Sequence, residues 1–369
     1  MSDNNYQIYF DCGYSKLRVA AHNKVDSNKI FYTESNFFFD HTNIDLETQK
    51  IITFLEKNTN EYIDNINLLI DSPKMLSIGI SISKKIDGSK LKQQDIQFLV
   101  QEAKQQVSKN YNNQSIAHII INNYKINEVD YDYLQTEINC KIISLDIIFI
   151  CLPEETIEYF KNIFYKFDIS INQIICTSYA KAINYKNNFS SNKNVTFIDV
   201  GFNKTSITSF VNNKIISLSA LPIGGNHITK DISKLLKIDL KQAEQLKLDL
   251  DKNKAFLDDK NYSIELLQKI IFARTEEILE MSILCIKSNL MTESHYKMIL
   301  TGDGSRILDN QYKDKISFAN SIDFLDETIE DICQSGFKLA MGSNKQEVVV
   351  VPKKQIKQGF FEKLFHFFK

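Results

Sequence analysis

Near its start the chain reads Tyr6-Gln7-Ile8-Tyr9-Phe10-Asp11-Cys12-Gly13-Tyr14-Ser15-Lys16-Leu17, and just past its midpoint it reads Asn194-Val195-Thr196-Phe197-Ile198-Asp199-Val200-Gly201-Phe202-Asn203-Lys204-Thr205. Each stretch is an apolar strand followed by Asp-x-Gly, an aromatic residue, a polar residue and a lysine. The two aspartates lie 188 positions apart in a chain of 369 residues, close to half its length. This duplication predicts two related halves, each opening with a strand, a tight turn and a second strand.

Two such turns facing each other across a cleft would suit a nucleotide and its metal ion. Phosphates need backbone N–H donors and cations, and magnesium is held mostly through carboxylates and water. Asp11 and Asp199 are therefore the candidate Mg²⁺ ligands. Either turn alone would more simply be an ordinary β-hairpin, and the duplication is what favours phosphate binding. The candidate nucleotide contacts are Asp11, Gly13, Tyr14, Ser15 and Lys16 from the first turn, and Asp199, Gly201, Phe202, Asn203, Lys204 and Thr205 from the second.

Three weaker patterns add candidates in the second half. A buried strand ends in Gly302-Asp303-Gly304-Ser305, a strand-to-helix turn that could present its backbone to a sugar or a purine. Gly225 follows Pro222-Ile223-Gly224 and opens a predicted helix. Glu244 and Lys247 share one face of another predicted helix and could reach a nucleoside, although their spacing alone favours a solvated ion pair.

Bulk composition excludes several classes of function. A net charge of −2 argues against nucleic-acid binding. The six cysteines are scattered, without the paired spacing of a zinc site, and are typical of reduced thiols. The six histidines show no hydrolase-triad or metal-ligand spacing. The first residues are polar and do not resemble a signal peptide, and the longest apolar run, 142–152, is too short to cross a bilayer.

Helical and strand periodicities predict an α/β protein with a mostly parallel sheet in each half. We expect the first lobe to comprise residues 1–65 and 146–193, with an α+β insert at 66–145. The second lobe would comprise 194–225 and 297–350, with a small helical subdomain at 226–296. We also expect a helix over 45–58 with Asp45 as its N-cap.

The end of the chain has the pattern of a membrane anchor. A basic linker, 351–358, precedes a short segment, 359–369, that is apolar on one helical face. Such a segment would lie in the plane of an anionic membrane, and an array of copies would hold firmly where one copy binds weakly. The alternative is a terminal helix docked on its own core. The candidate membrane residues are Phe360, Phe361, Lys363, Leu364, Phe365, Phe367, Phe368 and Lys369.

Together these segments resemble the actin/Hsp70 ATPase superfamily and, within it, the FtsA family of bacterial cell-division proteins. The two Asp-x-Gly turns look like its phosphate segments, and Leu300–Ser305 is similar to its adenosine segment. Leu221–Ile232, Ala243–Lys247 and Ala273–Ile278 resemble further segments of the family in the same order. The resemblance covers essentially the whole chain, including the insert and the aromatic C-terminal segment.

The resemblance implies an actin-like two-lobe fold of duplicated ribonuclease-H-like domains, an FtsA-type insert and a C-terminal amphipathic helix. It implies ATP and Mg²⁺ between the lobes, polymerisation, and attachment of the tubulin-like protein FtsZ to the cytoplasmic face of the inner membrane at the division site. Arg274 would be a candidate contact for the FtsZ tail, and 66–145 would meet other division proteins.

This chain departs from the family pattern at the expected site. Phe202 and Asn203 stand where the family usually has glycine, and Asp303 replaces the middle glycine of the adenosine segment. We therefore expect ATP binding with weak or no hydrolysis. Two alternatives stay open: an actin-fold sugar or acetate kinase, for which the sequence offers no convincing catalytic base, and a PilM-like adaptor of pilus assembly.

Overall fold

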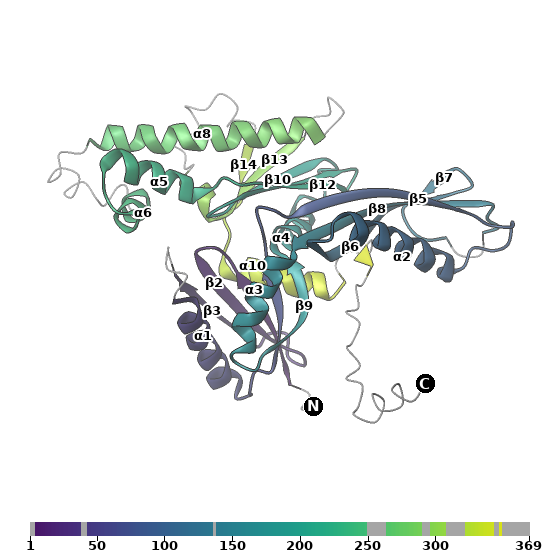
Figure 1. The fold of residues 1–369 in the computed structure, drawn as a ribbon, viewed down its shortest axis with the longest axis horizontal. Coiled ribbons are helices and arrows are strands. Elements are labelled where there is room, and N and C mark those ends of the chain that lie inside the picture. The colour runs from purple at the N-terminus through teal and green to yellow at the C-terminus, as the bar shows by residue number, and fades with distance from the viewer. Residues whose placement is uncertain are drawn as a thin grey trace.

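The fold is built on two sheets that repeat the same strand order. In the computed structural model, which describes residues 4–37, 43–135, 138–248, 263–289, 296–307, 322–342 and 347–348, the sheets have the orders β3-β2-β1-β4-β9 and β12-β11-β10-β13-β14. Figure 1 places the first below the second, with a third sheet projecting to one side. The predicted actin-like two-lobe α/β fold is thus confirmed.

The first sheet is the frame of the first lobe. Its strands are β1 (Tyr6–Cys12), β2 (Lys16–Asn23), β3 (Ile30–Asn36), β4 (Asn65–Ile70) and β9 (Ser170–Cys176). β1, β2 and β3 form an antiparallel meander, whereas β4 runs parallel to β1 and β9 parallel to β4. The expectation of a mostly parallel sheet was therefore wrong, because the duplicated hairpin contributes antiparallel strands to each half.

The second sheet repeats this plan. Its strands are β10 (Val195–Val200), β11 (Thr205–Val211), β12 (Lys214–Leu221), β13 (Lys297–Thr301) and β14 (Ile322–Phe324). β10, β11 and β12 form the antiparallel meander, and β13 and β14 add parallel strands. Asp199 pairs with Thr301 of β13 just as Asp11 pairs with Leu69 of β4, so the two aspartates occupy equivalent positions.

The third sheet and one helix form the insert. The strands are β5 (Leu76–Lys85), β6 (Gln114–Ile126), β7 (Val129–Tyr131), β8 (Ile142–Pro153) and β15 (Glu347–Val348), and the helix is α2 (Gln93–Asn110). α2 buries Ile96, Leu99, Ala103 and Val107 against this sheet, as their spacing of three and four predicts. The insert therefore has a hydrophobic core of its own.

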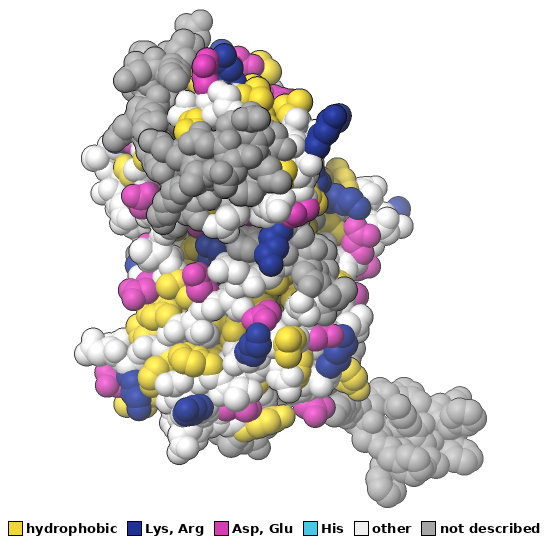
Figure 2. Space-filling view, turned by 90° about the vertical axis from the view of Figure 1, so that its left-hand side faces the viewer, with side chains coloured by type: hydrophobic (Ala, Val, Ile, Leu, Met, Phe, Trp, Pro, Cys, Tyr) yellow, Lys and Arg dark blue, Asp and Glu magenta, His cyan; other side chains and the backbone are white. Residues whose placement is uncertain are grey.

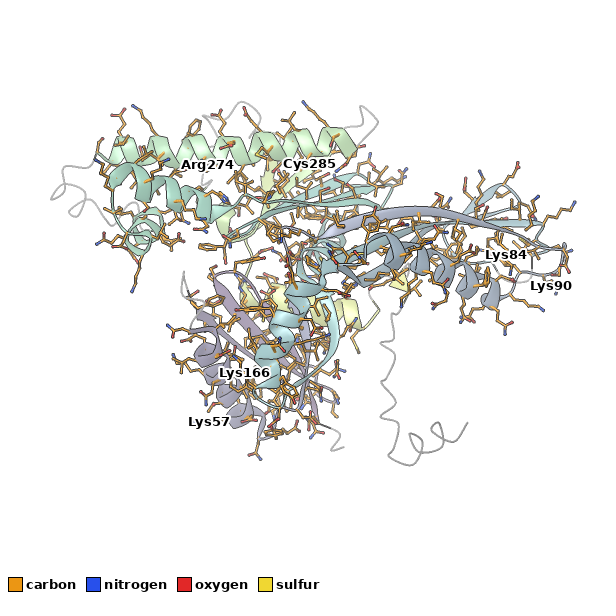
Figure 3. The ribbon with its side chains drawn as sticks, viewed as in Figure 1. Lys57, Lys84, Lys90, Lys166, Arg274 and Cys285 are labelled. Carbon is orange, nitrogen blue, oxygen red and sulfur yellow. The ribbon has the colours of Figure 1, made fainter. Side chains whose placement is uncertain are left out.

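Helices pack on both main sheets and bury apolar faces there. In the first lobe these are α1 (Ile44–Thr59), α3 (Glu154–Tyr165), α4 (Thr177–Lys186) and α10 (Ile329–Ala340), with a short 3-10 turn at Asn187–Phe189. The second lobe carries α5 (Gly225–Leu236), α6 (Leu240–Leu248), α8 (Ile264–Asn289) and the 3-10 turn η3 (Asp303–Ile307). Arg274 extends from α8 toward α5, where it pairs with Asp231 (Figure 3). The N-cap of α1 is Asn43, and Asp45 lies in the first turn, so the expected cap was wrong.

The expected subdomain boundaries differ from the structure at both ends of the insert. β4 pairs with β1, so residues 66–70 are part of the first sheet. β8 pairs with β5 and β6 as far as Pro153, so residues 146–153 are part of the insert sheet. Both segments are short apolar runs, and such a run carries no periodicity that tells which sheet will bury it.

The last described elements also leave the second lobe, where we expected residues 297–350 to lie. α10 packs on α4 and against the first sheet, and its Leu339 joins the first hydrophobic core. β15 pairs with β6 of the insert, and its Glu347 contacts His118 at 2.6 Å. The chain therefore crosses from the second lobe back to the first between β14 and α10 (Figure 1).

Two features of the described residues bear on the membrane and nucleic-acid expectations. Among the helices in the described part of the chain, none is long and apolar enough to cross a bilayer. On the face drawn in Figure 2, basic and acidic side chains are interspersed. The predicted amphipathic segment, 359–369, lies outside the described residues.

Candidate functional site

The two duplicated turns have the same backbone geometry. The N–H of Gly13 donates to the carbonyl of Lys16 at 2.9 Å, and the N–H of Gly201 donates to the carbonyl of Lys204 at 2.9 Å. Each bond closes a turn between two antiparallel strands, β1 to β2 and β10 to β11. Both turns line one cavity of about 500 Å³. The repeated Asp-x-Gly stretches thus face each other across a shared cleft between the lobes.

Most of the candidate nucleotide contacts line this cavity. They are Asp11, Gly13, Tyr14, Ser15, Lys16, Asp199, Gly201, Phe202, Lys204, Gly225, Glu244, Lys247, Gly302, Asp303 and Gly304. The side chains of the remaining three make contacts elsewhere. The hydroxyl of Thr205 donates to the carbonyl of Ile223 at 2.8 Å, and that of Ser305 donates to the carbonyl of Gly302 at 2.6 Å. Asn203 accepts a hydrogen bond from Asn226 at 2.8 Å.

The turn after β13 packs closely on the second Asp-x-Gly turn. Gly302 has φ +92°, and a Cβ there would lie within 2.5 Å of the Val200 carbonyl oxygen. A Cβ on Gly304 would lie 2.7 Å from the Val200 Cγ1. Glycine is required at 302 both by backbone conformation and by space. These contacts bring Asp303 to the rim of the cavity, next to the first lobe.

Glu244 and Lys247 form a buried pair, so the solvated ion pair that their spacing favoured was wrong. Their charged atoms are 2.6 Å apart, and the side chains are 7% and 3% exposed. The ammonium group of Lys247 also donates to the Gly225 carbonyl at 3.1 Å and to the Thr229 hydroxyl at 2.8 Å. Burial lowers the pKa of Lys247, against the opposing effect of Glu244. The pair closes the cavity from the helical side of the second lobe.

Asp11 is neutralised within the protein. Its Oδ2 lies 3.1 Å from a guanidinium nitrogen of Arg18, and its Oδ1 accepts a hydrogen bond from the Thr177 hydroxyl at 2.9 Å. Burial raises the pKa of Asp11, and the Arg18 charge and the Thr177 hydrogen bond oppose that rise. Both carboxylate oxygens are thus engaged by the first lobe itself.

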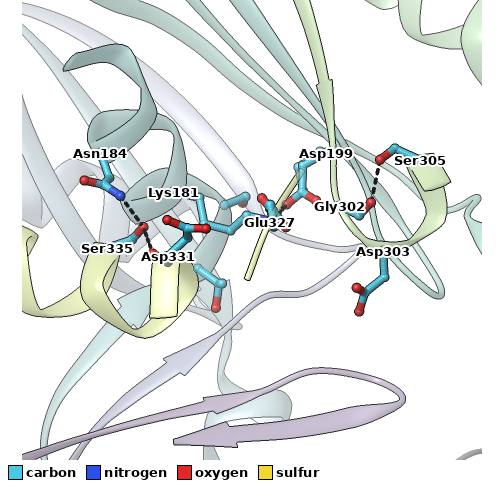
Figure 4. Close-up of polar contacts among 12 residues, drawn as sticks. Lys181, Asn184, Asp199, Gly302, Asp303, Ser305, Glu327, Asp331 and Ser335 are labelled. Atoms are coloured by element: carbon cyan, nitrogen blue, oxygen red, sulfur yellow. Dashed lines mark hydrogen bonds and ion pairs between the residues drawn. The ribbon is translucent and has the colours of Figure 1, made fainter. Parts of the chain in front are cut away.

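Asp199 is paired with a buried lysine that the sequence analysis did not single out. The ammonium group of Lys181, on α4, lies 2.9 Å from Asp199 Oδ2 and 2.7 Å from Glu327 Oε1. Figure 4 shows the three side chains between the two lobes. Burial by itself raises the pKa of Asp199, but the charges of Lys181 and Lys204 outweigh it and hold that pKa below its ordinary value. Burial lowers the pKa of Lys181, but the carboxylates of Asp199 and Glu327 outweigh burial and raise it.

Further ion pairs join the lobes across the cleft. Lys204 of the second turn lies 2.9 Å from Asp71, which follows β4 in the first lobe. Asp303 pairs with Lys16 at 3.1 Å and also with Arg18. Asp303 therefore engages two cations of the first lobe that a phosphate would otherwise attract.

The carboxylates of the cleft are a poor match for the implied magnesium ion. Mg²⁺ prefers nearly octahedral oxygen coordination and retains several waters. Within the described ranges, no group of three or more His, Cys, Asp or Glu side chains is placed to hold a metal ion. Asp11 is engaged by Arg18, and Asp199 by Lys181. This donor set fits the protein's own cations better than it fits a divalent metal.

Sequence reasoning missed several residues that line the cavity. Arg18, Asp71, Thr177, Lys181 and Glu327 all do so. A signal existed for two of them. Arg18 is one of only three arginines in the chain, and Lys181 stands between two alanines. Asp71 and Glu327 lie in connections whose neighbours in space are remote in sequence, so no local pattern marks them.

Comparison with known sequences gives matches in parts of the chain. The model of the family described as cell division protein FtsA matches residues 196–265. The FtsA of Bacillus subtilis is 31% identical over 128 residues, covering 30% of this chain and 29% of that protein. The FtsA of Neisseria meningitidis is 44% identical over 54 residues, covering 15% of this chain and 13% of that protein. The alignments thus span less than a third of each of these relatives.

Comparison with solved structures covers nearly the whole chain. A type IV pilus biogenesis complex of PilM and PilN contains a chain that matches with a TM-score of 0.57 and 11% identity, over 88% of this chain and 89% of that one. At this identity the likeness concerns the fold alone. The sequence matches and the duplicated sheets agree with the resemblance predicted from the motifs. The chain has an actin-like two-lobe fold and is similar, in parts of its sequence, to the cell-division protein FtsA.

Proposed function

We infer that this chain is a cell-division scaffold that binds ATP, polymerises, and tethers FtsZ to the cytoplasmic face of the inner membrane at the division site. The single observation that carries this proposal is the cleft lined by both Asp-x-Gly turns, in a chain whose second turn lies inside the FtsA match. A cavity of about 500 Å³ is of the size that holds a small ligand.

The chemistry of the cleft supports a nucleotide. Lys16 and Lys204 reach it from opposite lobes, and Arg18 lies beside them. A polyphosphate lying between the lobes would compete with Asp303 and Asp71 for these cations. The buried Glu244–Lys247 pair, at the other wall, would meet the nucleoside.

The same cleft supports binding without efficient hydrolysis. Phe202 lines the cavity where a smaller residue would leave room for a third phosphate, and its ring lies 5.9 Å from the Lys247 ammonium. No catalytic residue is proposed here. An actin-fold kinase would need a catalytic base beside its acceptor substrate, and for this reason we do not favour that function.

The nucleotide proposal is tested with Asp199→Ala. Removing this carboxylate takes away one of the two groups that position Lys181 and should weaken ATP binding, measured by isothermal titration calorimetry. Asp45→Ala is the matched control. Asp45 forms a surface ion pair with Lys166 at 2.5 Å, and it is not among the residues that line the cavity. Equal ATP affinity in the Asp199 variant would remove this residue from the site.

The partner proposal centres on Arg274 in the helical subdomain of the second lobe. Its side chain is 27% exposed and pairs with Asp231 and Glu277, at 2.6 Å each. A carboxylate of the FtsZ tail would compete for this guanidinium group. Arg274→Ala should weaken binding of an FtsZ tail peptide, measured by fluorescence anisotropy. The exposed Lys269, which pairs with Glu265 on the same helix, is the control position.

The membrane and filament proposals rest on the segment 359–369 and on the family resemblance. A chain lacking this segment should no longer sediment with anionic liposomes, whereas unchanged sedimentation would refute the anchor. The likeness in fold to the PilM-containing complex favours a second candidate, an adaptor of pilus assembly. Such an adaptor does not need the amphipathic segment, so the liposome assay separates the two. Contacts of the insert with other division proteins remain part of the first proposal.

A further inference from the structure

Lys181 lines the cleft and joins three parts of the chain. It lies on α4 of the first lobe, and its ammonium group meets Asp199 at the end of β10 and Glu327 in the connection that leads to α10. The three side chains are 7%, 14% and 4% exposed. A buried ammonium group persists only where carboxylates compensate the loss of water, and here two do so.

Charge compensation at this point leaves little need for a divalent ion. Each carboxylate at the base of the two turns has a protein cation within ion-pair distance: Asp11 has Arg18 at 3.1 Å, and Asp199 has Lys181 at 2.9 Å. Asp71, which faces the second turn, has Lys204 at 2.9 Å. A metal ion placed between the turns would be repelled by these like charges, and it would have to displace at least one of them from its carboxylate.

Lys181 also lies where a metal ion would act. It lines the same cavity as Gly201, Lys204 and Gly302. Burial raises the pKa of Asp11 in the first lobe, and the charge of Lys181 is one of the effects that oppose this rise. The ammonium group thus lies within ion-pair distance of Asp199, in the cavity that both turns line, where the two turns would be expected to hold a metal ion.

We propose that the ammonium group of Lys181 takes the place of the divalent cation, so that this cleft binds nucleoside polyphosphates without a metal ion. The proposal rests on the nucleotide site inferred above and specifies how that site meets its ligand. Lys181 is here a specificity-determining residue: it supplies a fixed positive charge in the cleft and excludes Mg²⁺ from the same position. A purely structural role for Lys181, holding α4 to β10, would leave any metal requirement unaltered.

The test is ATP affinity, measured by titration calorimetry on the full-length chain with Mg²⁺ present and with excess EDTA. For the unaltered chain, we expect the two dissociation constants to agree within about twofold. A loss of affinity of about tenfold or more in EDTA, with binding intact in Mg²⁺, would overturn the inference and leave the nucleotide site standing. Absence of binding under both conditions would overturn the inference and the nucleotide site together.

Variants at Lys181 make the test reciprocal. Lys181→Ser removes the cation and leaves Asp199 and Glu327 facing an open space, so ATP binding should become dependent on Mg²⁺. Its melting temperature should also rise on addition of Mg²⁺ alone, which the unaltered chain should not show. Lys181→Arg keeps a cation and should remain indifferent to EDTA. The control is Lys74→Ser, because Lys74 makes an exposed ion pair with Glu155. A Lys181→Ser chain that binds ATP equally well in EDTA would overturn the inference.

Discussion

Replacing Gly302 with alanine should destabilise the second lobe strongly, because two independent costs coincide there. The backbone has φ +92°, a conformation that side chains rarely adopt, and such strain costs of order 1–3 kcal/mol. A Cβ would also lie within 2.5 Å of the Val200 carbonyl oxygen and close to the Asp199 carboxylate. Overpacking of this kind costs about 1–3 kcal/mol. The sum, about 2–6 kcal/mol, is a large part of the stability of an ordinary domain.

Alanine substitutions at three other glycines allow the cost of backbone strain and the cost of crowding to be measured separately. Gly88 has φ +89° with no atom within 4 Å of an added Cβ, so Gly88→Ala should show the strain alone. Gly304 has no positive φ, but its Cβ would lie 2.8 Å from the Val200 carbonyl oxygen, so Gly304→Ala should show the crowding alone. Gly79, in β5, has neither, and Gly79→Ala should stabilise by roughly 0.5–1 kcal/mol.

The assay has to report on the stability of each lobe separately, because a chain with several hydrophobic cores need not unfold in one step. Urea unfolding gives the overall change, and amide hydrogen exchange of peptides from β10 and β13 gives the local one. We expect the exchange protection of these strands to fall most in Gly302→Ala, less in Gly304→Ala, and not at all in Gly79→Ala. If Gly302→Ala were as stable as Gly88→Ala, the inferred crowding between the two turns would be refuted.

Two further predictions concern affinity and pH. Asp303→Ala frees Lys16 and Arg18 from two partly exposed ion pairs. Each pair contributes about 0.5–1 kcal/mol after solvent screening. The variant should therefore bind ATP roughly 5- to 30-fold more tightly, measured by calorimetry. The control is Asp323→Ala, which breaks an exposed ion pair with Lys297 and should leave the ATP affinity unchanged. Weaker ATP binding in Asp303→Ala would contradict the prediction and show that Asp303 contacts the ligand favourably. Burial lowers the pKa of His22, which stacks on Phe337, to about 4. In the unfolded chain the pKa of this histidine is about 6.5. Between pH values of about 6.5 and 4, only the unfolded chain binds the proton. The free energy of unfolding should therefore fall by up to roughly 3 kcal/mol as the pH is lowered through this range. His22→Phe should remove that part of the pH dependence in urea titrations, and an unaltered slope would contradict it.

Much of the site was predictable because its backbone is local. The two Asp-x-Gly turns each close within four residues, and the strands on either side are apolar runs of ordinary length. Their repetition at half-chain spacing was enough to predict the duplicated sheets and a shared cleft. Glycines at 302 and 304 were likewise visible as a strand-to-helix turn, since short-range backbone demands leave a mark in the sequence.

The charge arrangement inside the cleft was not predictable from the sequence. Lys181, Asp199 and Glu327 are far apart along the chain, and the fold alone decides that they meet. The sequence placed β4 in the insert and α10 in the second lobe, because the free energy that assigns a short apolar element to a sheet comes from long-range packing. The repeated turns, the elements and the family likeness could be recognised in the sequence alone. Tertiary structure decided which lobe each element joins and that the protein's own cations neutralise the paired carboxylates, since ion pairing in a buried cleft depends on distance in space and on desolvation.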